Sequence, residues 1–323
     1  KFVSKIEELK NPANKAFSPL ATSSSDDSVV RVDSASGINK SASYDITVHR
    51  LATKDTRLSQ VIAGDATDLA DQHDEGSVEV TIGDRTETIT VTVTHDDGSA
   101  KTNEEILQSF ADELNNLFGE KVNATLFHTD SNGSIQLSVR SAETGHAERI
   151  QFDADNASGA LDEIVNNMTR ITPENELDAS FEVNGVTFTR GQNTVDDAIS
   201  GLTFTLLDAT GAAEEMVVEK DLEKAKENVE SFITAFNELN KTIRDLTYLD
   251  GDTGSRGRLQ GMRAIRNLTY DLRNAATMPM AGADEGAISS LLEIGIGFDS
   301  NGTMKIEDED LLEEILLERP EEV

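Results

Sequence analysis

The stretch LEKAKENVESFITAFNELNKTIRDL (222–246) decides how the C-terminal third of this 323-residue chain folds. Its apolar side chains recur at alternating steps of three and four, as they do along one face of a long helix. They are Leu222, Ala225, Val229, Phe232, Phe236, Leu239, Ile243 and Leu246. A helix with this heptad stripe needs a partner surface, so the pattern predicts an intrachain helix bundle, with coiled-coil-like packing.

The segments around this helix supply candidate partners. A loop at 249–257 is followed by a second apolar stripe from Leu259 to Ala275, and further helices are expected near 284–293 and 308–318. At the other end of the chain, KFVSKIEELK (1–10) also has helical spacing and is stopped by Asn11 and Pro12. We expect helix 1–10 to pack on the C-terminal helices.

Between these helical ends, from about 29 to 217, the period of the pattern becomes two. The alternating segments have β-branched residues and turn residues between them, which is typical of strands. They are SVVRVDSAS, SYDITVHRLA, GSVEVTIGD, TETITVTVTH, NATLFHTD, GSIQLSVRSA, ASFEVNGVTFTRG and GLTFTLLDA. Two helices interrupt them: 102–119, with Thr102 or Asn103 as cap and Gly119 as stop, and 159–168. The Ser-, Asp- and Pro-rich segment 18–28 is predicted to be a linker.

These patterns predict an α+β multidomain fold, in which a helical bundle built from both chain ends carries two inserted β-rich domains. The predicted bundle comprises 1–25 plus 218–323. The first β-rich domain comprises 26–66 plus 172–217, and the inserted one comprises 67–171 with one or two helices.

Composition excludes several classes of function. The chain has 61 acidic and 28 basic residues, which argues against nucleic acid and against an anionic membrane surface as partners. It has no cysteine, so disulfides and thiolate sites are excluded, and no apolar run is long enough for membrane insertion. The chain opens at Lys1 and stops just after a helical pattern, and we interpret it as an internal piece of a longer protein.

The acidic stretch LLEIGIGFDSNGTMKIEDEDLLEEI (291–315) raises the question of a calcium loop. An EF-hand counted from Asp299 would need an oxygen ligand at 303 and a glycine at 304, where Thr and Met stand. DSNG is instead a hairpin-turn signal, TMKI favours a short strand, and the acids after it suit a helix N-terminus. DGDTG (250–254) is interpreted as a solvated turn, and GIGFDS lacks the third glycine of a dinucleotide loop. We expect no specific calcium binding.

No constellation of catalytic residues is visible. The five histidines, at 49, 73, 95, 128 and 146, have no metal-ligand spacing and are interpreted as surface residues. There is no GxSxG motif, and the carboxylates lack the aromatic platforms of glycosidases, since the chain has no Trp and three Tyr. The sequence therefore predicts no enzyme, and no catalytic, cofactor-binding or metal-binding residue.

Several motifs resemble the flagellar filament cap family, also called hook-associated protein two. SSSDDSVVRVDSASG (23–37) with SYDITVHRLA (43–52) resembles its N-terminal region, and FEVNGVTFTRGQNTVDDAISGLTFTLLDATG (181–211) resembles its IN motif. VESFITAFNELNKTI (229–243), GRLQGMRAIRNLTYDLR and IGIGFDSNGTMKIEDEDLLEEILLERPEEV resemble its C-terminal region. The middle, about 66–172, matches only loosely. The motif residues are Asn184, Gly185, Arg190, Asn193, Ile199, Gly201, Leu206, Phe232, Phe236, Asn237, Gly295, Asp299 and Gly302.

The resemblance implies a structural assembly protein at the extracellular distal tip of the bacterial flagellum, needed for motility. Family members are exported by the flagellar type III route and meet an export chaperone on the way. They form a small homo-oligomeric ring, a pentamer or similar, on helical legs, and they promote flagellin folding and insertion beneath it. Their long terminal helical arms are absent here, so ring formation and attachment to the filament are expected to be weaker.

Two other classes of protein remain open. A hook–filament junction protein or a flagellin-like axial subunit would share IN-type motifs. A surface adhesin that binds mucin or another host glycan would also be β-rich and acidic.

Overall fold

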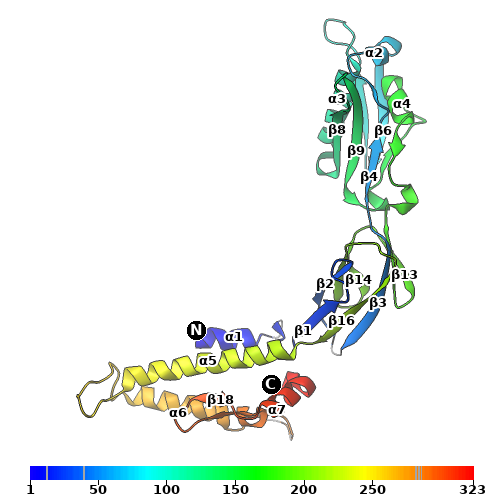
Figure 1. Cartoon of the computed structure of the whole chain (residues 1–323). Coiled ribbons are helices and arrows are strands. Elements are labelled where there is room, and N and C mark those ends of the chain that lie inside the picture. The colour runs from blue at the N-terminus through cyan, green and yellow to red at the C-terminus, as the bar shows by residue number, and fades with distance from the viewer. Residues whose placement is uncertain (12–13, 39–40, 281, 283, 285) are drawn as a thin grey trace. The chain divides into compact units, whose positions relative to one another are not determined.

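The structure is a computed structural model that describes the chain except residues 12–13, 39–40, 281, 283 and 285 and the side chain of Arg266 (Figure 1). The chain divides into two compact units. Unit 1 comprises Lys1–Ala21, Asn39–Ala42 and Val218–Val323, and unit 2 comprises Thr22–Ile38 and Ser43–Val217. None of the described helices is long and apolar enough to cross a bilayer.

Helices occupy both chain ends and interrupt the β-rich middle. They are α1 (Phe2–Leu9), α2 (Asp68–Gln72), α3 (Asn103–Phe118), α4 (Gly159–Asn166), α5 (Leu222–Thr247), α6 (Arg263–Thr277) and α7 (Glu309–Glu318). The helices predicted at 1–10, 102–119, 159–168 and 222–246, in the stripe from Leu259 to Ala275, and at 308–318 are therefore confirmed. The α+β class is also confirmed.

The strands form antiparallel pairs. In chain order they are β1 (Leu20–Ser24), β2 (Val30–Ala35), β3 (Ala42–Arg50), β4 (Lys54–Leu58), β5 (Ile62–Ala63), β6 (Glu75–Ile82), β7 (Arg85–Thr92), β8 (Val122–His128), β9 (Ser134–Thr144), β10 (Ile150–Phe152), β11 (Thr169–Arg170), β12 (Ala179–Val183), β13 (Val186–Arg190), β14 (Thr194–Ile199), β15 (Leu202–Leu206), β16 (Ala213–Lys220), β17 (Ile296–Phe298) and β18 (Met304–Ile306).

Helix α5 is the axis of unit 1. It contacts α1, α6 and α7 and the short β17–β18 hairpin, and its heptad face provides much of the core (Figure 1). Val229, Phe236 and Ile243 are buried, while Phe232 is half-buried against the same core. These elements cover much of the apolar stripe, as a stripe of this length requires. The helical bundle predicted from both chain ends stays a prediction.

Unit 2 holds four sheets. Two contain the strands on either side of the inserted segment, in the orders β1-β16-β3-β12-β13 and β14-β15-β2. The other two contain the inserted strands, in the orders β10-β6-β7 and β11-β4-β9-β5, with β8 also paired to β9. The predicted boundaries of the two β-rich domains, at 66 and 172, stay predictions. Pairing of β4 and β5 with β9 favours a first boundary closer to residue 53.

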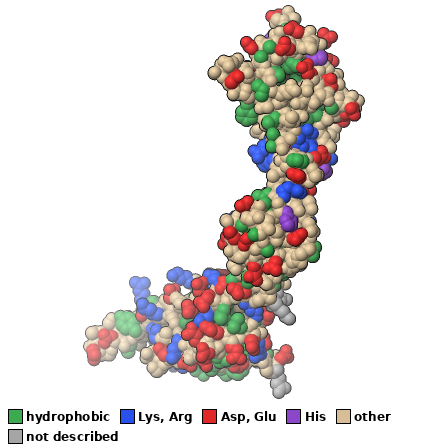
Figure 2. Space-filling view, turned by 45° about the vertical axis from the view of Figure 1, so that its right-hand side comes forward, with side chains coloured by type: hydrophobic (Ala, Val, Ile, Leu, Met, Phe, Trp, Pro, Cys, Tyr) green, Lys and Arg blue, Asp and Glu red, His purple; other side chains and the backbone are tan. Residues whose placement is uncertain are grey.

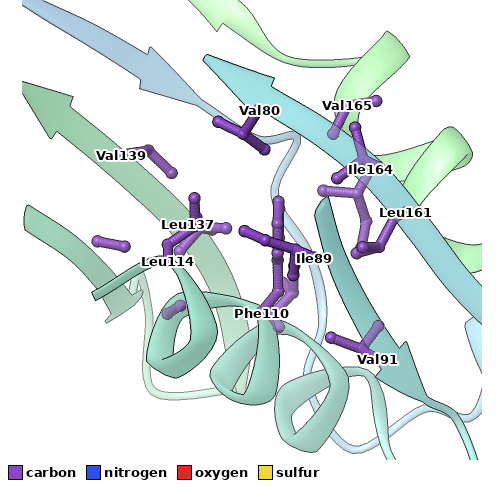
Figure 3. Close-up of a cluster of buried hydrophobic side chains, with 14 of the residues drawn as sticks. Val80, Ile89, Val91, Phe110, Leu114, Leu137, Val139, Leu161, Ile164 and Val165 are labelled. Carbon is purple, nitrogen blue, oxygen red and sulfur yellow. The ribbon is translucent and has the colours of Figure 1, made fainter. Parts of the chain in front are cut away.

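The core of the inserted segment lies between α3, α4 and these strands (Figure 3). Phe110 and Leu114 of α3 point toward Leu137 of β9 and Ile89 of β7. The local sequence fixes α3 at both ends. Thr102 and Glu105 exchange side-chain and backbone hydrogen bonds in a capping box, as the cap prediction required, and Gly119 ends the helix with φ +58°.

Two predictions about unit 1 and its border are wrong. The segment predicted as a linker, 18–28, contains β1, which pairs with β16 far along the chain. The helix expected at 284–293 is present only as a 3₁₀ turn, Leu291–Ile294, although 285 lies outside the described residues. Its place is taken by chain held through long-range bonds, such as the Ile288 N–H donating to the Glu322 carboxylate at 3.1 Å.

Candidate functional site

The motif residues singled out in the sequence fall into two groups, one in each unit. Asn184, Gly185, Arg190, Asn193 and Gly201 lie in unit 2. Phe232, Phe236, Asn237, Gly295, Asp299 and Gly302 lie in unit 1. Each group holds segments together that are distant in the sequence.

In unit 2, Asn184 and Gly185 form the turn between β12 and β13. Both have positive φ, +50° and +80°, which Asn and Gly tolerate better than other residues. The Asn184 side-chain oxygen accepts from the Asp45 N–H at 2.9 Å, and the Asn184 N–H donates to the Asp45 carbonyl at 2.8 Å. The tip of the hairpin is therefore fastened to β3.

Asn193 makes a second fastening of the same kind. Its amide oxygen accepts from the Ala52 N–H at 2.7 Å, and its amide nitrogen donates to the Ala52 carbonyl at 3.0 Å. One side chain thus pairs with both backbone groups of one residue, as a neighbouring strand would. Because these two bonds satisfy polar groups just after β3, they hold the start of the inserted segment against the β13–β14 connection.

Arg190 lies at the end of β13 and acts locally. Its Nε is 2.8 Å from Asp197 Oδ1, and its guanidinium lies 5.7 Å from the centre of the Phe188 ring. The hydrogen bond from Arg190 holds the pKa of Asp197 below its usual range. Asp197 is exposed, so this pair orders β13 against β14 rather than contributing much stability.

In unit 1, four phenylalanines pack against one another around α5. The ring centre of Phe236 is 5.9 Å from that of Phe2 in α1 and 5.5 Å from that of Phe298 in β17. Phe232, one turn earlier, is 5.8 Å from Phe2. The aromatic residues of α5 therefore join the two ends of the chain.

The same helix holds the β17–β18 hairpin through its polar side chains. Asn237 donates to the Met304 carbonyl and accepts from the Met304 N–H, both at 2.9 Å. Asn240 donates to the Gly302 carbonyl at 2.7 Å, and Arg244 donates to the Asn301 carbonyl at 3.2 Å. Asn240 and Arg244 are functional contacts that were not predicted from the sequence. Their spacing from Asn237 could have indicated them, since residues three and four positions apart lie on the same helix face.

Asp299 closes the turn of this hairpin with its side chain. Its Oδ1 accepts from the backbone N–H groups of Asn301 and Thr303, at 2.9 and 2.8 Å. The pKa of Asp299 is lower than its ordinary value, and the hydrogen bond from the Thr303 N–H is the largest cause. Gly302 follows with φ +76°, as the interpretation of DSNG as a turn requires. The carboxylate that would begin a calcium loop thus faces backbone donors.

We expect Asp299→Asn to remove part of the acid sensitivity of unit 1. The folded-state pKa is depressed, so the carboxylate stabilises the fold above its unfolded pKa of about 3.9, and this stabilisation is lost as pH falls through the folded value. Thermal unfolding should therefore show a gap between wild type and variant at pH 6 that narrows toward pH 2. The control is Asp245→Asn, which removes an exposed carboxylate of α5. An unchanged gap for Asp299→Asn would contradict the assignment.

Gly295 is the remaining residue of this group. It ends the 3₁₀ turn at φ +79°, and its carbonyl accepts from the Glu307 N–H at 2.7 Å. A Cβ at this position would lie 2.3 Å from the Asp308 carbonyl oxygen. Only glycine therefore permits the close approach that starts α7 beside β17.

One lysine of α5 pairs with two glutamates of α7. Lys226 Nζ lies 2.7 Å from Glu309 and 2.6 Å from Glu313, and these hydrogen bonds raise its pKa. Unit 1 also contains a largely apolar groove of about 470 Å³. Its lining includes Ile6, Leu9, Phe17, Phe232, Ile294 and Val323.

Unit 2 contains a buried ion pair that was not predicted from the sequence. Asp55 is fully buried, accepts from the Ile150 N–H at 2.8 Å, and lies 3.2 Å from Arg170 Nε. Arg170 also pairs with Glu174, which lies 2.8 Å from Arg149 Nε. Arg170 precedes β12 closely, so this network lies near where the inserted segment ends. Charge alone gave no signal, because acidic residues occur throughout the sequence.

The five histidines lie on different elements of unit 2, each near one glutamate. The Nε2 to carboxylate distances run from 3.2 Å, for His146 and Glu174, to 3.7 Å, for His128 and Glu104. Within the described residues, no three His, Asp or Glu side chains are grouped as metal ligands. Acidic side chains are spread widely over the visible face (Figure 2). The arrangement of the motif residues is suited to holding backbone segments in place.

Comparison with known proteins shows which family the chain is similar to. The family described as "Flagellar hook-associated protein 2 C-terminus" matches residues 177–323. The lateral flagellar hook-associated protein 2 of Vibrio parahaemolyticus is 28% identical over 282 residues, which cover 84% of this chain and 60% of that protein. The B-type protein of Pseudomonas aeruginosa is 26% identical over 320 residues, covering 93% and 64%. The chain thus spans somewhat under two thirds of the length of these relatives.

Solved structures agree on the fold. The crystal structure of the D1-D2-D3 domains of the flagellar cap protein FliD from Escherichia coli superposes with a TM-score of 0.72, at 24% identity, over 98% of this chain and 83% of that one. FliD (HAP2) from P. aeruginosa PAO1 gives a TM-score of 0.54 at 24% identity, over 69% and 98%. The C-terminal part of this chain, residues 177–323, therefore matches the flagellar hook-associated protein 2 family, and the longer chain is similar to relatives of that name.

Proposed function

We propose that this chain is a structural component of the cap at the distal end of a bacterial flagellar filament. The observation that carries the proposal is the use of the motif residues: Asn184, Asn193 and Asn237 each pair with both backbone groups of one distant residue. Such residues make a rigid scaffold. The proposal is supported by the names of the relatives, which are a flagellar hook-associated protein and a flagellar cap protein.

In this proposal unit 1 is a helical leg, and unit 2 is a plate made of two β-rich domains. Copies assemble into a small ring above the growing filament. The ring keeps arriving flagellin in a confined space where it folds and inserts beneath the cap. A rigid plate serves this purpose because a deforming one would lose its hold on the subunit that is being added.

The proposal also covers the route and the partners. The chain reaches the outside through the flagellar type III apparatus, accompanied by an export chaperone, and acts without catalysis. Binding to mucin or another host glycan remains a separate prediction.

Immunogold electron microscopy of intact flagella, with antibody raised to this chain, tests the location. We expect gold particles at the distal tip of each filament and nowhere else. A strain that lacks the gene should show no label and should release unassembled flagellin into the medium, because subunits leaving the filament would no longer be retained.

Other label positions would contradict the proposal in different ways. Gold along the filament would indicate a flagellin-like subunit, and gold between hook and filament would indicate a junction protein. Gold on the cell surface away from flagella would indicate an adhesin.

A further inference from the structure

One end of unit 1 differs in charge from the rest of this acidic chain. Residues 241–273, where α5 ends and α6 begins, have seven basic and four acidic side chains, against 28 and 61 in the whole chain. We call this segment the basic end. Its six described basic side chains are all exposed: Lys241, Arg244, Arg256, Arg258, Arg263 and Arg273.

These cations make no ion pair within the part of the chain that the structure describes. Arg244 donates to a backbone carbonyl and Arg273 lies over the Phe298 ring, and neither contact neutralises the charge. In contrast, Lys226, on the same helix α5, is paired with two glutamates. Unpaired cations in a chain with twice as many acids as bases indicate that their counterions come from elsewhere.

Exposed apolar side chains lie among these cations. Tyr270 is 67% exposed and Leu249 is 60% exposed, and Tyr248, Met262 and Leu268 are exposed as well. Figure 2 shows Lys and Arg side chains beside hydrophobic ones toward the left-hand end of unit 1. Tyr, Met and Arg are enriched in protein interfaces, where they supply large contact areas and charge-assisted hydrogen bonds. The basic end therefore has the composition of a docking surface for an acidic protein.

A complementary surface lies on α7 of the same unit. Asp310, Glu314 and Glu318 follow one another at steps of four, are exposed, and make no ion pair within the described residues. We call them the acidic row. Lys226 holds α7 near the start of α5, whereas the basic end begins near its finish. From Lys226 to Tyr248 the helix axis covers about 33 Å, so the two surfaces are well separated.

We infer that the basic end of one copy docks on the acidic row of a second copy of this chain. This inference rests on the proposed function, because it supplies the contact by which copies would assemble. Two different patches that fit each other give a head-to-tail interface, which closes into a ring when the rotation between copies permits. Charge complementarity fixes the orientation, since the mostly acidic surface of each copy repels any other approach.

The test is sedimentation velocity of the full chain at 150 mM salt, where screening leaves mainly the close contacts. We expect wild type to self-associate, and Arg258→Glu and Glu314→Lys each to weaken the association at least tenfold. A mixture of the two variants should recover it, because the altered patches then face each other with opposite charge and the unaltered patches keep their native partners. The matched control is Arg140→Glu, an exposed and unpaired arginine of β9 in unit 2, which should associate as wild type does.

The inference is overturned if wild type stays monomeric, if the two variants associate like wild type, or if Arg140→Glu weakens association equally. Failure of this interface can be distinguished from failure of the proposed function. If gold labels the filament tip but Arg258→Glu associates like wild type, only the proposed interface is contradicted. If gold does not label flagella, the cap proposal is contradicted, whatever the result of the sedimentation experiment.

Discussion

Phe236→Asp is expected to unfold unit 1 at room temperature. The side chain is 5% exposed and lies between the rings of Phe2 and Phe298. Removing a buried phenylalanine costs about 3–5 kcal/mol, and leaving a carboxylate unpaired in the core adds a further cost of several kcal/mol. Together these terms approach the whole stability of a domain, about 5–15 kcal/mol.

Circular dichroism with thermal unfolding measures this effect. Unit 1 holds most of the helix, with 26 residues in α5 and 15 in α6 against 16 in α3 of unit 2, so most of the helical signal should disappear. Thr234→Asp is the matched control, because it places the same carboxylate on the exposed face of α5. A Phe236→Asp variant that melts like wild type would contradict the packing described for α5.

The most periodic parts of the fold were predictable from the sequence. Helix α5 was visible because its stripe is long, and α3 because its cap and its stop residue are both of the preferred types. The Asn184–Gly185 and Asp299–Gly302 turns were visible because few residues tolerate positive φ. In each case the sequence signal that predicts the element lies within a short local segment of the chain.

The wrong predictions concern segments whose structure depends on distant contacts. Strand β1 was assigned to a linker because its pairing partner, β16, lies about 190 residues away. The segment 284–293 has apolar residues at helical spacing, but Ser289 binds the Glu293 carboxylate and the Met280 N–H donates to the Ser289 carbonyl. These contacts favour a bend and a single 3₁₀ turn. Local propensity predicts poorly where distant contacts satisfy the backbone.

The candidate site was predictable only in part. Asn193 and Asn237 were recognisable as motif residues, but their partners, Ala52 and Met304, lie 141 and 67 residues away. An asparagine in a sequence does not reveal which backbone groups it will pair with. Asn240, Arg244 and the Asp55–Arg170 pair were missed for the same reason, since their function is defined only by what lies opposite them.

Gly201→Ala is expected to destabilise unit 2 by about 3–5 kcal/mol, as the sum of left-handed backbone strain and a steric clash with the main chain. Gly201 is the second residue of the two-residue turn between β14 and β15, with φ +81°. Its carbonyl accepts from the Ser36 N–H at 2.7 Å, while a Cβ would lie 1.9 Å from the Ser36 carbonyl oxygen. The methyl group would therefore force apart the turn and the end of β2, which the hydrogen bond holds together.

Gly211→Ala separates the clash from the strain. Gly211 has a similar φ of +68°, but nothing lies within 4 Å of a Cβ built there. Its substitution should cost only the strain of a left-handed alanine, about 1–2 kcal/mol. Urea unfolding of both variants measures the difference between the two costs. Equal destabilisation would mean that β2 yields to the methyl group without loss, and that Gly201 is required only for its backbone conformation. A clearly larger cost at 201 would mean that the motif glycine is needed because another strand passes directly beside it.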